Sequence, residues 1–111
     1  MADLGQRLKR QEENNMNVIF HPIADDEYWN QIDYYGKISE SLGDRFEQSV
    51  DKVITGIVNN PYLCHNRGEG IFSVRLKGFP FSVFYRLNGK DIYILSICHE
   101  RRDPNVWKFR K

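Results

Sequence analysis

The chain of 111 residues has little cysteine: Cys64 and Cys98 are its two thiols, and they stand far apart. Neither the density of a secreted disulfide scaffold nor a CxxC spacing is present, which makes a reducing cytosol the simplest setting. A run of about 18 apolar residues is also missing, so no membrane-spanning helix is expected. No apolar segment follows the charged N-terminus, which argues against a secretory signal.

Metal-ligand spacing is absent as well. The three histidines, at positions 21, 65 and 99, are widely separated, and the adjacent pair Cys64 and His65 has poor geometry for a shared ion. Neither a metal nor another cofactor is expected.

Charge, by contrast, is plentiful and unevenly divided. Residues 61–111 carry ten Lys or Arg against four acids, a net of +6, whereas residues 1–60 carry six against eleven, a net of −5. The overall +1 therefore hides a dipolar molecule, and the two halves indicate two different partner surfaces. A chance association of acidic helices with basic strands remains the alternative.

The length fits one domain, which we assign to residues 17–111. Residues 1–16 are polar and are expected to form an extension outside the core. Two interpretations of this segment stay open: either Met16 is the natural start, or the segment is a short helical extension.

Apolar spacing predicts helices over 24–42 and 44–59. The second helix has a core-facing stripe, and Asp44 with Glu47 resembles a capping box after a break at Gly43. Alternating apolar residues and turn signals, including Asn88-Gly89, predict strands over 18–21, 71–76, 81–87 and 92–99. The prediction is an α+β domain of order β-α-α-β-β-β, with a helical hairpin on an antiparallel sheet.

Several motifs follow this order. They are ADDEY at 24–28, LGDRFEQSV at 42–50, Asn60-Pro61, VRLKGFPFSVFYRL at 74–87 and ICHERRDPNVW at 97–107. In order and spacing they resemble the RelE/ParE superfamily of type II toxin–antitoxin systems, most closely its ParE branch. The resemblance implies a cytoplasmic toxin, often described as a plasmid stabilisation protein, that a cognate antitoxin neutralises. ParE-type toxins are associated with inhibition of DNA gyrase, whereas RelE-type toxins cut messenger RNA on the ribosome.

Residues toward the end of the sheet are the candidate target-binding set: Arg75, Arg86, His99, Arg101, Arg102 and Trp107. Cations and a histidine could assemble a metal-free nuclease site, which needs a base, an acid and charge stabilisation. However, Ser82 stands where nucleolytic relatives commonly carry an arginine, and no tyrosine follows Tyr93. We therefore expect gyrase inhibition without an assigned catalytic residue, and keep the ribosome-dependent endonuclease as the alternative. A plain nucleic-acid-binding module lacks the clustered strand aromatics that it would need.

The candidate antitoxin-binding set lies on the first helix. Tyr34 and Ile38 are four residues apart, away from the core stripe, and Trp29 lies nearby. Apolar side chains in such positions can mark a groove for a partner segment. The alternative is that they fill the seam of the helical hairpin.

Overall fold

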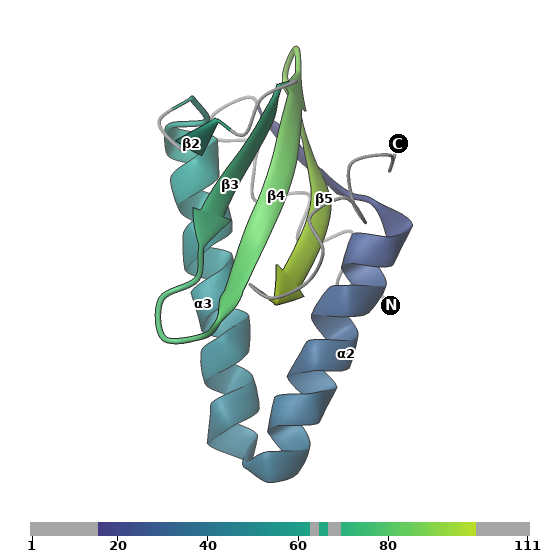
Figure 1. Cartoon of the computed structure of the whole chain (residues 1–111), viewed down its shortest axis with the longest axis vertical. Helices are drawn as coiled ribbons and strands as arrows, with labels where there is room; N and C mark the ends of the chain where they lie inside the picture. Colours follow the sequence, from purple (N-terminus) through teal and green to yellow (C-terminus); the bar gives the residue numbers. More distant parts are fainter. Residues whose placement is uncertain (1–15, 63–64, 67–69, 100–111) are drawn as a thin grey trace.

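A computed structural model describes residues 16–62, 65–66 and 70–99 of the chain. Its elements follow the expected order, with one additional short strand, β2. They are β1 (Asn17–Phe20), α2 (Pro22–Ile38), α3 (Glu40–Asn59), β2 (His65–Asn66), β3 (Ile71–Arg75), β4 (Phe81–Asn88) and β5 (Asp91–His99). Figure 1 shows α2 and α3 as a hairpin beside the sheet, with the corner between the helices lying beyond the end of the strands.

The α+β architecture is confirmed, and the sheet differs from expectation in one pairing. Its strand order is β1-β5-β4-β3-β2, and all neighbours are antiparallel except β1, which runs parallel to β5. After β1 ends, the chain stays beside β5. The His21 N–H donates to the Ile94 carbonyl at 2.9 Å, and Glu27 of α2 accepts a hydrogen bond from the Ile97 N–H. The chain thus continues beside β5 from β1 into the first turns of α2.

The first helix begins earlier than predicted. Pro22 occupies its first turn, where a missing N–H costs nothing, and the Nδ1 atom of His21 accepts a hydrogen bond from the Ile23 N–H at 3.1 Å. The Pro22 that ends the strand also starts the helix. The sequence prediction had placed the start near Ala24.

The corner between the helices falls at Ser39, not at Gly43. The Ser39 hydroxyl accepts from the Leu42 N–H at 3.1 Å and caps α3, so the predicted capping role of Asp44 was wrong. Gly43 is buried inside α3, where an added Cβ would lie 3.0 Å from the Cα of Gly36 in α2. The missing side chain of Gly43 thus serves close helix packing rather than a turn.

A β-bulge in β5 changes which side chains face the helices. Phe84 pairs with Ser96 and Tyr85 pairs with Ile94, which leaves Leu95 as the extra residue. Before the bulge the even-numbered residues of β5 face the helices, and after it the odd-numbered ones do. The bulge therefore determines the orientation of the last residues of the strand.

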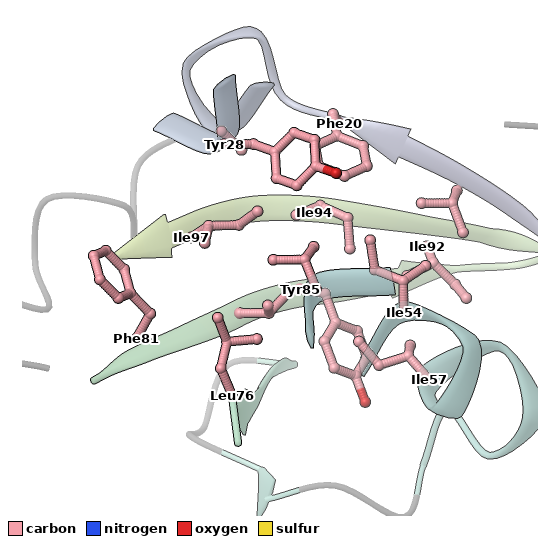
Figure 2. Packing of buried hydrophobic residues seen from close by; sticks show 14 of the residues in the cluster. Phe20, Tyr28, Ile54, Ile57, Leu76, Phe81, Tyr85, Ile92, Ile94 and Ile97 are labelled. Atoms are coloured by element: carbon pink, nitrogen blue, oxygen red, sulfur yellow. The ribbon is translucent and has the colours of Figure 1, made fainter. Parts of the chain in front are cut away.

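The main core lies between the helices and the sheet. The predicted α3 stripe is confirmed: Phe46, Val50, Ile54 and Ile57 are at most 1% exposed. Figure 2 shows Ile54 and Ile57 packed beside Tyr85 of β4. The Tyr85 hydroxyl donates to the Pro61 carbonyl at 2.7 Å, which satisfies its one polar group in the apolar surroundings.

The far face of the sheet carries a smaller buried cluster, made of Ile71, Phe84, Leu95 and Cys98. Its presence confirms that β5 is apolar on both faces, as the sequence predicts for a strand inside the sheet.

Met16 is half-buried and packs against the main core, although the sequence had placed it in the N-terminal extension. The remainder of that extension, residues 1–15, lies outside the described residues, and the division into an extension and a single domain stays a prediction.

Candidate functional site

Two of the predicted target-binding residues lie on the sheet face that points away from the helices. Arg75 ends β3 opposite Ser82, and Arg86 lies in β4 opposite Ile71 and Tyr93. Four ladder steps separate the two arginines along the strands, which corresponds to roughly 13 Å. They share a face without forming one compact cation pair.

His99 lies on the opposite face. It pairs with Phe81, a core residue on the helix side, and the two rings meet edge to face with centroids 5.4 Å apart. The Leu95 bulge causes this placement, because without the extra residue the strand alternation would put His99 on the arginine side. The predicted target-binding residues that the structure describes therefore lie on two different faces of the sheet: Arg75 and Arg86 on one, His99 on the other. Arg101, Arg102 and Trp107 lie outside the described residues.

The predicted antitoxin-binding residues are also divided. Tyr34 and Ile38 are 57% and 60% exposed, so they do not fill the hairpin seam. Trp29 is half-buried against the core, stacks edge-on with Tyr28 and donates its Nε1–H to Asp25 at 3.2 Å. The helical period places Trp29 on a different face of α2 from the other two.

A cavity of about 770 Å³ lies between α2 and the ends of β4 and β5. It joins members of both predicted sets, because Tyr34 forms part of one wall and His99 part of the other. Its lining residues are Glu27, Asn30, Gln31, Tyr34, Tyr35, Phe81, Ile97, Cys98 and His99. The polar α2 residues were missed from the sequence, although Glu27, Asn30, Gln31, Tyr34 and Ile38 follow the i, i+3, i+4 spacing of one helix face.

Tyr35, which lines this cavity, has a raised pKa. Burial, together with the neighbouring Tyr34, raises the pKa of the Tyr35 phenol above its ordinary value of 10.0. Tyr35 is therefore protonated at neutral pH.

A second cavity, of about 480 Å³, lies at the other end of the sheet. Arg86 and His21 contribute its basic groups, and the remaining walls are Ile19, Phe20, Pro22, Leu87, Asn88, Tyr93 and Leu95. Arg86 thus borders an apolar depression that is separate from the cavity at His99.

Within residues 16–62, 65–66 and 70–99, no group of three or more His, Cys, Asp or Glu side chains could hold a metal ion. None of the helices described is long and apolar enough to cross a membrane.

The helical hairpin on a mixed sheet, with a basic strand-rich half, defines a small α+β toxin fold of the RelE/ParE type. A sequence model of the ParE toxin of the type II toxin–antitoxin system, parDE, matches residues 18–104. The chain belongs to the ParE toxin family.

Among solved structures, the chain is similar to one titled the chromosomal ParDE TA system from P. aeruginosa. The TM-score is 0.65 at 20% sequence identity, over 78% of this chain and 97% of that chain. At this identity the likeness concerns the fold. A search of the curated proteins finds no match.

Proposed function

We propose that this ParE-family toxin acts in the cytoplasm by inhibiting DNA gyrase and that a cognate antitoxin neutralises it. The observation that supports this target over messenger RNA is the separation of His99 from Arg75 and Arg86 by the sheet. RNA cleavage needs a proton-transfer group and phosphate-binding cations around one phosphate. Of the predicted target-binding residues that the structure describes, His99 faces away from both arginines.

The proposed contact with gyrase is the segment that continues from β5, with Arg101, Arg102 and Trp107 as its principal side chains and His99 at its start. Arginine and tryptophan are the residue types that most often dominate the energy of protein interfaces. Arg75 and Arg86 extend the basic surface on the outer face of the sheet and are expected to strengthen the encounter with an acidic partner.

The proposed antitoxin contact is the exposed end of α2. Tyr34 and Ile38 present apolar area next to the 770 Å³ cavity, which offers amide and hydroxyl partners for a polar group of the antitoxin. Trp29 is half-buried on a different face of α2 and contributes at the edge of this contact. This surface is distinct from the residues proposed to contact gyrase, except at His99.

The target is tested by replacing both Arg101 and Arg102 with Ala. We expect loss of growth arrest and of gyrase inhibition in a supercoiling assay, with an unchanged melting temperature, because side chains that contact gyrase must be accessible and substitutions of accessible charges rarely alter stability by more than about 0.5 kcal/mol. The matched control replaces Lys77 and Lys90, two exposed basic residues of the same half of the chain, and should remain toxic. Codon-positioned cleavage of translated messages with normal supercoiling would contradict the gyrase target and favour the endonuclease alternative.

The antitoxin surface is tested by replacing Tyr34 and Ile38 with Ala. Toxicity should persist, while rescue by a co-expressed cognate antitoxin weakens and the antitoxin Kd rises by at least about tenfold, as expected for the loss of two apolar anchors. Lys37→Ala is the control, because Lys37 lies between them on the helix and makes only an exposed ion pair with Asp33. Equal rescue of all variants would show that the antitoxin binds elsewhere.

A further inference from the structure

The end of β5 extends beyond the strand that supports it. β1 pairs with β5 only as far as Ile94, and the chain then turns into α2. From Leu95 onward this edge of β5 has no strand beside it among the described residues. The backbone N–H groups that point to this side still require hydrogen-bond partners, because a buried unpaired N–H is costly.

Glu27 supplies the missing partner. Its Oε1 atom accepts hydrogen bonds from the Ile97 backbone N–H at 3.0 Å and from the Ser96 hydroxyl at 3.0 Å. Ser96 and Ile97 are 1% and 2% exposed, so little water reaches either donor. One carboxylate oxygen in the second turn of α2 thus takes the place of a neighbouring strand.

The position of this contact gives it a consequence beyond stability. Two residues after Ile97 the strand ends at His99, and the chain enters the segment proposed to contact gyrase. Directly beside it lies the 770 Å³ cavity, which separates the last residues of β5 from the following turns of α2. Ile97 itself packs in the main core, but beyond it the cavity lies between Cys98 and His99 and the following turns of α2, so the Glu27 contact is the last described link between the two elements.

We propose that Glu27 is a positioning residue, which fixes the end of β5 at Ser96 and Ile97 and so positions His99, from which the proposed target-binding segment continues. The proposal rests on the proposed function, since it assumes that residues after His99 contact the target. The role requires an oxygen acceptor at the right reach, not a negative charge.

Three variants at position 27 test separately whether the contact depends on the length of the side chain or on its negative charge. Glu27→Ala removes the acceptor, Glu27→Gln keeps an oxygen in place without the charge, and Glu27→Asp keeps the charge but falls short by one methylene. Amide hydrogen exchange of Ile97 reports on the contact directly. We expect exchange to accelerate about tenfold or more in the Ala and Asp variants, the factor that corresponds to loss of one net hydrogen bond, and to stay near wild type in the Gln variant.

Gyrase inhibition should follow the same order. The concentration for half-inhibition of supercoiling should rise about tenfold or more for Ala and Asp and remain near wild type for Gln. Asp26→Ala is the matched control, because it removes an exposed acid from the neighbouring position of the same helix. If the Ala variant does not fold, the Asp and Gln variants make the same comparison.

Several results would overturn the proposal. Wild-type potency in a variant whose Ile97 amide exchanges faster would show that the contact is purely structural. Unchanged exchange in the Ala variant would show that the contact does not protect the strand end, and a Gln variant as weak as Ala would assign the effect to charge. If the wild-type protein leaves gyrase active, the proposed target is wrong. The variants are then compared by the growth arrest that they cause, and full toxicity of Glu27→Ala would refute the role of Glu27.

Discussion

Replacing Gly43 by alanine tests whether the two helices are held together by a backbone-to-backbone approach. An added Cβ would lie 3.0 Å from the Gly36 Cα, 3.1 Å from its N and 3.3 Å from the Ile32 carbonyl oxygen. Carbon atoms prefer about 3.5–4.0 Å, so α2 must move away by roughly half an ångström. All three neighbours are backbone atoms, which cannot rotate aside.

The expected net effect combines two opposing terms. Alanine gains about 1 kcal/mol of helix propensity over glycine, whereas overpacking a tight contact costs about 1–3 kcal/mol. Gly43→Ala should therefore be neutral to destabilising by about 2 kcal/mol. Gly56→Ala in the same helix has no atom within 4 Å of the new Cβ and should stabilise by about 0.5–1 kcal/mol.

Thermal and urea denaturation, followed by circular dichroism, make this comparison. The Gly56 variant should melt at least about 2 °C above the Gly43 variant, because 1 kcal/mol corresponds to roughly 4–8 °C in a domain of this size and the expected difference is at least about 0.5 kcal/mol. Gly36→Ala, whose Cβ would also meet no atom within 4 Å, should behave like the Gly56 variant. A Gly43 variant that melts as high as these two would refute the close-approach argument.

Three further outcomes are expected. Ser39→Ala should lower the free energy of unfolding by about 1 kcal/mol in urea titrations, whereas Ser39→Asp, which keeps an acceptor at the cap, should change it little. Tyr85→Phe should cost about 0.5–1.5 kcal/mol in the same assay, because the Pro61 carbonyl loses its donor. Burial raises the pKa of Tyr35, so the folded chain keeps this proton to higher pH than the unfolded chain. The wild type should therefore lose stability relative to Tyr35→Phe once the pH rises past 10.0, with no such change below it; equal pH profiles would contradict this.

Much of the fold could be predicted from local patterns. The α3 stripe and the alternate residues Phe81, Val83 and Tyr85 of β4 reflect burial against the opposing layer, which apolar spacing in the sequence records. The helix corner was misplaced because Gly43 has two uses that the sequence does not distinguish: a turn, or a close contact with a helix far along the chain. The parallel pairing of β1 was missed because local pattern carries no information on which distant strand is the partner.

The candidate site was harder to predict, and the bulge at Leu95 is the main reason. Regular strand alternation along β5 would place His99 on the same face of the sheet as Arg75 and Arg86. The extra residue, Leu95, moves His99 to the face that packs against the helices. Similarly, helical spacing could identify Tyr34 and Ile38 as lying off the core stripe, but it could not tell whether Trp29 packs inward. The positions of His99 and Trp29 both depend on three-dimensional packing that involves residues distant in sequence.

The parallel pairing of β1 with β5 also bears on synthesis of the toxin. Asn17 and Asp91, which are hydrogen-bonded to each other, are 74 positions apart, so β1 cannot pair with β5 until at least 74 further residues have been translated. Contacts of such long range close late and expose apolar strand edges in incomplete chains. A nascent or truncated chain that lacks β5 would therefore be a substrate for proteases and chaperones rather than a partly active toxin, and toxicity would begin only with completed molecules.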